Sequence, residues 1–456
     1  MSENHLTSRR SFILTVAGAA IGAPFVLNSV FASVPAKKIR HACIGVGGMG
    51  GYDLKNFKSH SDVEIVALCD VDENHLKKAG EIVPGARLYT DWRELLKKEG
   101  NNIDSVNVTV PDHNHFVIAM GAIALGKNVY CQKPMCHDVA EVRTLTQAAV
   151  KKGVVTQLGT QIASSVGDRT AVQWIKEGHI GKVKHVYLCS NRSGIDGYRL
   201  EGPRPANAET VPATLDWDKW LGTAPERAFA SNIYHPGIWR TWQDFGTGWS
   251  GDIGCHIFDA VWKGLDLNAP LTVKAEVQQS WKDSTERRED TWPQGNHITW
   301  SFPGNERIEG DVLPLEWFDG EFYPPTEVQA LFKNDEKYPE EAAMLIGTEG
   351  ALLIPHGGTP VLLPESKFGK DKYPKLEDRN HYHQFVEGCL GRTKPESHFA
   401  QSGPMTEAIL LGTVAIRVPN TLLEWDSAKM KFPMNPEADK YLRRTYRKGW
   451  EVKEFG

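Results

Sequence analysis

Cysteine is scarce in this sequence, and its few cysteines follow no recognisable pattern. There are 7 cysteines in 456 residues, which is an odd number. The closest pair, Cys131 and Cys136, fits neither a CxxC redox motif nor a zinc ribbon. Cys43 and Cys69 fall in apolar segments that we expect to be core strands. The cysteines therefore argue against a disulfide scaffold and predict buried free thiols.

An excess of charge, internal repeats and low-complexity tracts are also absent. The formal net charge is -5, from 52 Lys and Arg against 57 Asp and Glu, and 41% of the residues are hydrophobic. This balance implies neither nucleic acid nor an acidic membrane surface as a partner. The length and composition predict a globular protein with two domains and a large buried core.

The N-terminus carries an unusual segment. Ser8-Arg9-Arg10-Ser11-Phe12-Ile13 precedes an apolar stretch that runs to Ala32, with small residues near its end. This resembles a twin-arginine export signal. We expect residues 1–37 to be signal and linker, and the mature protein to be periplasmic or extracellular without stable membrane association. The alternative is an uncleaved membrane anchor, since the stretch approaches spanning length, although its glycine and alanine content makes it only moderately hydrophobic.

A glycine-rich turn follows the first apolar run, Ile39 to Gly45. Its first glycine would allow a tight strand-to-helix turn, the second a close approach to a pyrophosphate, and the third the packing of the helix on the sheet. Asp70 ends the next apolar run and would accept hydrogen bonds from the adenosine ribose. Its charge, with no Arg or Lys before Lys77, favours NAD over NADP. The expected loop contacts are Gly45, Gly47, Gly48, Met49 and Gly50.

Apolar runs alternate with helical segments over residues 38–160, the expected NAD-binding domain. The later strand-like runs are Val63 to Asp70, Ser105 to Val110, Asn128 to Gln132 and Val154 to Leu158. The alternation predicts an α/β fold with a Rossmann doubly wound parallel sheet. Ligands bind beyond the carboxyl ends of such strands, so the loops at 111–115 and 132–135 should face the nicotinamide.

Residues 161–456 read as a second, α+β domain for the substrate and for oligomerisation. Leu271 to Val277 and Ile298 to Phe302 alternate apolar with polar residues, which predicts an open, mainly antiparallel sheet with one covered face. Because the exposed face of such a sheet often forms a subunit interface, we expect a homo-oligomer. A helix near Met405 to Ile416 should pack back on the body of the protein.

Asp252, His256 and Asp259 have the spacing i, i+4 and i+7, which places them on one helix face. A histidine flanked by carboxylates can accept a proton near neutral pH, as the oxidation of an alcohol requires. We therefore expect His256 to be a general base, with Asp252 positioning the hydroxyl and Asp259 contacting the substrate. The alternative is a core histidine satisfied by a neighbouring acid.

Lys133 lies in Cys131-Gln132-Lys133-Pro134, at the predicted carboxyl end of a strand. There its ammonium could contact the ribose or stabilise the alkoxide of a substrate hydroxyl, and the proline would fix the turn. A surface lysine without a role is the alternative.

Tryptophans crowd the loop before the Asp252 helix. Aromatic faces stack on sugar rings while interleaved polar groups bind hydroxyls, so we expect a carbohydrate ligand. At least half of these tryptophans should be core, including Trp217 and Trp220. The substrate candidates are Tyr234, His235, Trp239 and Arg240.

Taken together, the glycine fingerprint, the Lys-Pro at the fifth strand and the Asp-x-x-x-His-x-x-Asp helix resemble the Gfo/Idh/MocA oxidoreductase family. The resemblance implies that Lys133, Asp252 and His256 act on a sugar or polyol hydroxyl beside the nicotinamide. It also implies cofactor contacts from the Pro111 to His115 loop. The family usually has Glu where this chain has Gln132, which removes one expected negative neighbour of Lys133. The expected contacts outside the glycine loop are Asp70, Pro111, His115, Gln132, Lys133 and Gln161.

Two pairs of close histidines do not indicate a metal site. His113 and His115, like His381 and His383, are two residues apart with no third ligand evident, so we expect no metal.

Three functions agree with these features. The first is NAD-dependent oxidation of a ring hydroxyl of a sugar or glycoside, and our hypothesis for the oxidised carbon is C3. An exported enzyme has no replenished NAD pool, so we expect NAD to be bound tightly and recycled in place, as the resemblance to the family's exported glucose-fructose oxidoreductase also implies. The second is an NAD-dependent glycosidase that works by transient C3 oxidation and elimination, although the Thr-His-Gly-Leu-Gly-Pro stretch of such relatives is absent. The third is a non-catalytic sugar-binding protein with structural NAD.

Overall fold

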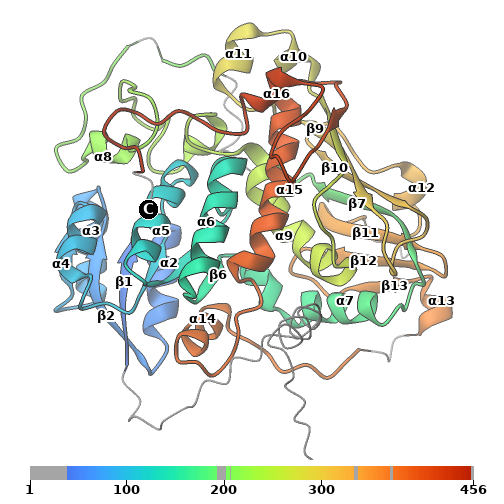
Figure 1. Cartoon of the computed structure of the whole chain (residues 1–456), viewed down its shortest axis with the longest axis horizontal. Coiled ribbons are helices and arrows are strands. Elements are labelled where there is room, and N and C mark those ends of the chain that lie inside the picture. The colour runs from blue at the N-terminus through green and yellow to red at the C-terminus, as the bar shows by residue number, and fades with distance from the viewer. Residues whose placement is uncertain (1–37, 193–201, 206, 333–336, 370–372, 453–456) are drawn as a thin grey trace, which may run out of the picture. The chain divides into compact units, whose positions relative to one another are not determined.

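The computed structural model describes residues 38–192, 202–205, 207–332, 337–369 and 373–452 (Figure 1). The predicted export signal within residues 1–37 lies outside the described residues. In the part of the chain that is described, no helix has the length and apolar character needed to cross a membrane.

The first sheet is the predicted doubly wound parallel sheet. Its order is β3-β2-β1-β4-β5-β6, and every neighbouring pair is parallel. The order reverses between β1 and β4, where α/β sheets bind ligands. Sequence analysis missed β3, a three-residue edge strand without a fully buried residue. The strands are β1 (Ile39–Ile44), β2 (Val63–Cys69), β3 (Arg87–Tyr89), β4 (Ser105–Val108), β5 (Asn128–Cys131) and β6 (Thr156–Leu158).

Five helices accompany this sheet. They are α2 (Met49–Lys58), α3 (Glu73–Ile82), α4 (Trp92–Glu99), α5 (His115–Ala124) and α6 (Val139–Lys152). Helix α5 is almost wholly buried and has no polar face, which explains its weak amphipathic signal. Side chains of Asp72, Asp91 and Asp138 cap the N-termini of α3, α4 and α6.

The second sheet is open and mainly antiparallel, as predicted. Its order is β13-β12-β11-β7-β10-β9-β8-β14, and only the β7–β10 pair is parallel. The period-two pattern is seen in β9, where buried and half-buried residues alternate. The strands are β7 (Val183–Ser190), β8 (Thr272–Val277), β9 (Asn296–Pro303), β10 (Val312–Asp319), β11 (Glu341–Gly347), β12 (Ala351–Pro355), β13 (Val361–Leu363) and β14 (Leu423–Glu424).

Long helices join the two sheets. Helix α15 (Phe399–Arg417) packs on α6 and on α9 (Gly248–Leu265), and Figure 1 shows α15 beside α6. Close approach of α15 and α6 needs a small residue, since a Cβ at Gly403 would lie 2.2 Å from Thr146 Oγ1 on α6. Helix α14 (His381–Cys389) packs on α2, and α7 (Val166–Lys176) packs on α9. These contacts make residues 38–456 one compact unit. The domain boundary expected between residues 160 and 161 therefore stays a prediction.

Short helical segments complete the described chain. They are η1 (Asp112–Asn114), η2 (Gln161–Ser164), α8 (Trp217–Leu221), η4 (Ile238–Thr241), α10 (Gln279–Lys282), α11 (Thr285–Asp290), α12 (Thr326–Gln329), α13 (Glu365–Phe368) and α16 (Pro436–Asp439). All seven cysteines lie in the described residues and are free thiols, six buried and Cys389 half-buried, as predicted.

Candidate active site

The glycine turn between β1 and α2 has the geometry that a dinucleotide loop needs. Gly45 has φ +81°, and a Cβ there would lie 2.0 Å from the Thr109 carbonyl oxygen. A Cβ at Gly50 would lie 2.1 Å from the Gly45 carbonyl oxygen. No side chain caps the amides at the start of α2, which begins at Met49. The turn therefore leaves a helix N-terminus able to receive a phosphate.

Asp70 follows β2 directly and holds this turn. Its Oδ2 accepts hydrogen bonds from the amides of Val46 and Gly47, at 2.8 and 3.2 Å, and its Oδ1 accepts one from the Asp72 amide at 2.9 Å. The side chain also faces the cleft in front of the turn. Asp70 can thus both fix the loop and present a negative charge to a ribose.

The cleft has a volume of about 480 Å³ and two walls from different parts of the chain. One wall is the glycine turn with Asp70, Val110, Pro111 and Asn114. The other includes Lys219, Trp220, Trp450 and residues 235–237, 239 and 240. A glycine cradle, a free helix N-terminus and a ribose-facing carboxylate fit a dinucleotide.

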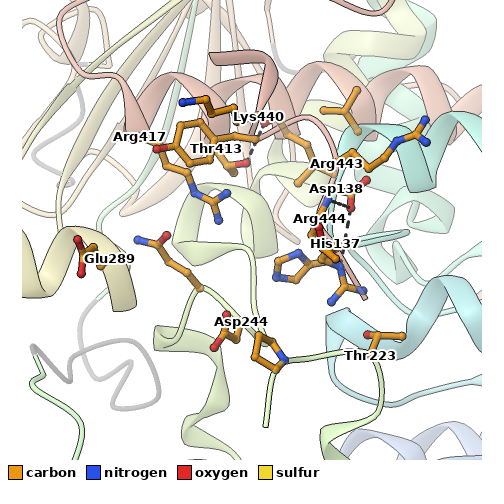
Figure 2. Close-up of a pocket in the computed structure, with 16 residues that line it drawn as sticks. His137, Asp138, Thr223, Asp244, Glu289, Thr413, Arg417, Lys440, Arg443 and Arg444 are labelled. Carbon is orange, nitrogen blue, oxygen red and sulfur yellow. Dashed lines mark hydrogen bonds and ion pairs between the residues drawn. The ribbon is translucent and has the colours of Figure 1, made fainter. Parts of the chain in front are cut away.

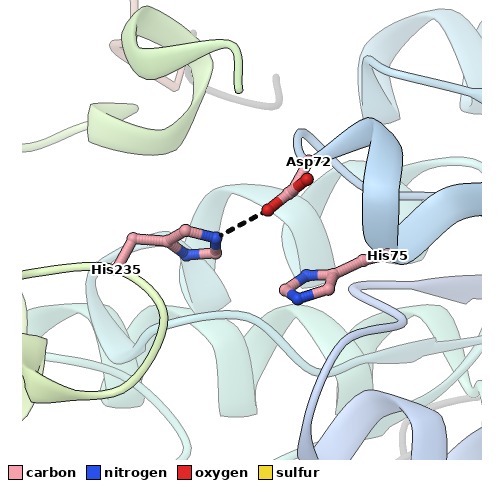
Figure 3. A group of neighbouring side chains, drawn as sticks. All are labelled: Asp72, His75 and His235. Atoms are coloured by element: carbon pink, nitrogen blue, oxygen red, sulfur yellow. Dashed lines mark hydrogen bonds and ion pairs between the residues drawn. The ribbon is translucent and has the colours of Figure 1, made fainter. Parts of the chain in front are cut away.

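Two histidines lie at the Asp70 end of this cleft, and Figure 3 shows them with Asp72. His235 Nε2 lies 3.0 Å from Asp72 Oδ2, and the His75 and His235 rings are 5.4 Å apart. A hydrogen bond to Asp70, opposed by burial, raises the pKa of His75. His235, predicted to bind substrate, lines the cleft at the expected ribose end, because residues 214–216 pair with residues 71–73; its substrate role stays a prediction. Sequence analysis missed His75.

Lys133 and Asp252 meet although they are 119 residues apart. Lys133 follows β5, and its Nζ lies 2.9 Å from Asp252 Oδ2 on α9. The same Nζ donates to the Asp252 carbonyl oxygen at 3.2 Å. Asp252 Oδ1 lies 3.6 Å from Arg240 Nε, and Arg240 lines the cleft. The ion pair therefore adjoins the dinucleotide cleft.

His256 lies one helical turn after Asp252. Burial, and then the nearby Lys133 charge, lower its pKa well below 6.5. Its buried Nδ1 has no hydrogen-bond partner among the described residues. A neutral imidazole at this place can accept a proton. The fold thus places Lys133 close enough to His256 for its charge to act on the ring.

Two further titratable groups of this site were missed. Asp112 is buried and accepts a hydrogen bond from Thr247 Oγ1 at 3.1 Å; burial and the Asp252 charge raise its pKa to about 8. The His356 ring, just after β12, lies 5.2 Å from the His256 ring. Asp112 falls in the loop already expected to face the nicotinamide, whereas no local motif marks His356.

Three predicted cofactor contacts are directed elsewhere. Gln132 Nε2 donates to Asp53 Oδ2 at 3.0 Å, and Tyr382 and Thr109 donate to the same buried carboxylate. A Glu at 132 would repel Asp53, so the amide suits this neighbour. Gln161 Nε2 donates to two tyrosine hydroxyls. Both ring nitrogens of buried His115 face carbonyl oxygens, of Val110 and Pro134, at 2.8 Å.

Two predicted substrate contacts were also wrong. Asp259 is buried and pairs with Lys263 at 2.7 Å, because seven residues along a helix displace it by about 10 Å from Asp252 even on the same face. Tyr234 is 2% exposed, inside an aromatic cluster with Trp217, Trp242 and Phe245. Trp217 and Trp220 belong to the same cluster, and Trp220 also lines the cleft. Trp239 and Arg240 do line the cleft, with the guanidinium 4.3 Å from the indole centroid.

A glycine turn facing a cleft, with a lysine, a carboxylate and a neutral histidine beside it, defines a Rossmann-fold oxidoreductase. Residues 39–160 match the model of an oxidoreductase family described by its NAD-binding Rossmann fold, and residues 168–309 match the C-terminal alpha/beta domain of the same family. The chain belongs to the Gfo/Idh/MocA oxidoreductase family.

Curated relatives are similar over part of the chain. A glycosyl hydrolase family 109 protein from Stenotrophomonas maltophilia is 28% identical over 189 residues, which are 39% of this chain and 41% of the relative. Myo-inositol 2-dehydrogenase from Thermotoga maritima is 27% identical over 154 residues, 34% of this chain and 45% of the relative. The matches thus span less than half of either relative.

Solved structures share the fold over more of the chain. An inositol dehydrogenase homolog from Azotobacter vinelandii, complexed with NADH and myo-inositol, has a TM-score of 0.56 at 17% identity, covering 86% of this chain and 98% of its own.

Proposed function

We propose that this protein is an NAD-dependent oxidoreductase that oxidises a ring hydroxyl of a sugar or glycoside, at C3 in our hypothesis. The observation that carries the proposal is the Lys133–Asp252 ion pair, 2.9 Å long, with His256 close enough for the Lys133 charge to lower its pKa. Arg240 connects this group to the dinucleotide cleft. The two curated relatives, a dehydrogenase of a polyol and a glycoside-acting protein, support a carbohydrate substrate.

Each residue has a defined task in this reaction. The Lys133 ammonium, oriented by Asp252, donates to the substrate oxygen and stabilises its alkoxide character. The neutral imidazole of His256 takes the hydroxyl proton. A bound nicotinamide supplies the chemistry of accepting the hydride from the same carbon. Asp112 is protonated below its pKa of about 8, so at neutral pH it adds no second negative charge beside Asp252. Trp239 and Arg240 offer an aromatic face and a hydrogen-bond fork to the sugar.

The substrate experiment screens sugars and glycosides with the purified protein and follows reduced nicotinamide by absorbance. Oxidation of at least one sugar, lost in His256→Ala, supports the proposal. No oxidation or cleavage of any sugar or glycoside, while NAD remains bound, would contradict the proposal and favour the third hypothesis, a sugar-binding protein with structural NAD. The position of the ketone product then tests C3.

Retention of NAD is part of the proposal, because we also propose export by the twin-arginine route to the periplasm or beyond. A nanomolar site, about -12 kcal/mol, would with an association rate of roughly 10⁶ M⁻¹s⁻¹ lose its ligand about every thousand seconds. Retention therefore needs tighter binding or a closed site. A resident cofactor must also be recycled, by oxidation of one sugar and reduction of another carbonyl.

Contacts across the cleft support a closed site. The Glu73 amide donates to the Thr214 carbonyl at 2.8 Å, and the Asp216 amide donates to the Val71 carbonyl at 2.9 Å. Together with the His235–Asp72 bond, these contacts hold residues 214–240 against the start of α3. Acid denaturation of the purified protein should release NAD in a one-to-one ratio. Release of much less would sink the retention hypothesis and leave the sugar oxidation open.

A second candidate function is redox-assisted glycoside cleavage. A ketone at C3 acidifies the C2 proton, so elimination of the leaving group needs a second base. His356, beside His256, supplies such a group, and the family 109 relative supports this hypothesis. Release of free aglycone without net reduction of nicotinamide would favour cleavage. Net reduction without aglycone release would favour the dehydrogenase. We propose a homo-oligomer in either case, with the open sheet as the subunit interface.

A further inference from the structure

A second cavity, separate from the dinucleotide cleft, lies between α15, the start of α6 and the C-terminal segment. Its volume is about 270 Å³. His137 and Asp138 line it from the start of α6, Arg417 from the end of α15, and Asp244 from the loop after η4. None of these residues belongs to the oxidation site proposed above. Figure 2 shows the Arg417 guanidinium and the His137 ring directed into the cavity.

Arg417 makes no ion pair among the described residues, although the charges of Asp244 and Asp138 act on it from a distance. Its guanidinium carbon lies 4.7 Å from the Trp292 ring centroid and 5.0 Å from the Tyr441 centroid. Its Nε is buried without a hydrogen-bond partner among the described residues. Burial lowers its pKa to about 10, so it stays charged at neutral pH. Aromatic rings therefore contact the guanidinium while its hydrogen-bond donors are available to the cavity.

Two of the three carboxylates that line the cavity, Asp138 and Asp244, are paired with other arginines, and the third, Glu289, is exposed. Asp138 Oδ2 lies 3.8 Å from Arg444 Nε and accepts the Arg444 amide at 3.2 Å. Asp244 pairs with Arg227 and, at 3.9 Å, with Arg204. The Arg417 side chain is half-buried and makes no ion pair among the described residues, so an anionic ligand would supply the partner that it lacks.

His137 gives a second, independent sign of a ligand. The residue is 8% exposed, and its Nε2 has no hydrogen-bond partner in the part of the chain described. The ring makes its other hydrogen bond to the backbone of Gln243, and burial lowers its pKa well below 6.5. Buried polar atoms in proteins are rarely left unpaired without a reason.

We propose that this cavity binds a small oxyanion, a carboxylate or phosphate group, with Arg417 as the main ligand and His137 as the second. The planar guanidinium fork matches the two oxygens of a carboxylate or phosphate. Exposed Arg443 adds positive charge at the cavity, so an incoming anion is attracted.

The test measures binding of malonate and of inorganic phosphate by calorimetry, on the full protein with saturating NAD so that the glycine turn is not available to anions. The wild type should bind at least one of them. Arg417→Gln should weaken binding by about ten- to a hundredfold, as expected for hydrogen bonds to a charged group. The affinity of Arg417→Lys should lie between those of the wild type and Arg417→Gln, since lysine keeps the charge and loses the planar guanidinium.

The matched control is Arg288→Gln, which removes an exposed arginine outside the cavity and should leave the affinity unchanged. Thermal unfolding gives a second readout, because a bound anion should raise the melting temperature of the wild type and of Arg288→Gln only. If Arg417→Gln does not fold, His137→Asn takes its place and should weaken binding several-fold. Equal affinity in wild type and cavity variants, or no binding by the wild type at millimolar anion, would overturn the proposal.

Discussion

Two groups of histidines and carboxylates lie near the residues that follow β2 and β5, and the pKa values of their histidines shift in opposite directions. At the oxidation site, burial and the Lys133 ammonium lower the pKa of His256. At the expected ribose end, His75 is 25% exposed at its side chain, and the hydrogen bond to Asp70 raises its pKa. The surroundings therefore favour the neutral form of the histidine in one place and the charged form in the other.

The difference comes from what surrounds each ring. Asp252 favours the charged form of His256, but its charge is already compensated by Lys133 and Arg240. Asp70 and Asp72 have no lysine or arginine ion pair among the described residues, and their acidic charge acts on His75. A histidine next to an acid is thus not sufficient to identify a base, because the partner of the acid decides the effect.

The largest expected effect is on catalysis. His256→Ala should lower turnover by roughly 10²- to 10⁴-fold, because the proton of the alcohol loses its acceptor. The rate of appearance of reduced nicotinamide, or of aglycone, measures it. His75→Ala is the matched control and should keep turnover within a few-fold. Wild-type turnover in His256→Ala would remove His256 from the mechanism and reverse the comparison.

Lys133→Met should lower turnover by about 10²- to 10³-fold, the loss typical of one donor to a developing oxyanion. Because Lys133 and Asp252 act as a pair, Lys133→Met with Asp252→Asn should cost much less than the product of the single losses. Bound NAD, measured after acid release, should be unchanged. Additive losses would contradict the pairing at 2.9 Å.

The pH dependence of kcat/KM should separate the two groups further. His256 is active when neutral, and its pKa is lowered, so activity is retained at pH 6.5 and is lost only as the pH falls through the lowered value. Lys133→Met removes one cause of that lowering, so the acidic limb of its residual activity should move to higher pH. A limb that does not move would show that another group titrates.

His235→Ala should accelerate NAD release about two- to tenfold, as the loss of one hydrogen bond across the cleft predicts. Stopped-flow or exchange with labelled NAD measures the rate. His383→Ala, at a histidine on the outer part of α14 that does not line the cleft, is the control. Unchanged release would mean that residues 214–240 do not retain the cofactor.

The smallest effect concerns stability. The folded-state pKa of His75 is raised above 6.5, so its contribution to stability is present below pH 6.5 and is lost as the pH rises through the raised value. Urea unfolding of the protein without NAD, at one pH below 6.5 and one pH above the raised pKa, should show this loss of stability in the wild type. His75→Gln should not show it. Equal pH dependence in both proteins would contradict the raised pKa.

Most strands of the two sheets could be predicted from the sequence, because the patterns that mark them are local. The β1 run and glycine turn, and the alternation in β8 and β9, are visible within a few residues. It missed β3 and β10, since β3 is short and partly exposed and β10 has Pro314 in its interior. Of the substrate candidates, Trp239 and Arg240 line the cleft, whereas Tyr234 is core, because aromatic residues fill a core and a binding site equally well.

By itself, the sequence determined the parts that depend on neighbouring residues: the glycine turn of Gly45 to Gly50, the carboxylate at the end of β2, and the helix that carries Asp252 and His256. Only the tertiary structure decided the parts that depend on distant ones. It paired Lys133 with Asp252 and not with Asp259, brought Asp112 and His356 to the site, and left Arg417 without an ion pair among the described residues. The physical reason is that burial and charge compensation, which set protonation, arise from packing between segments far apart in the chain.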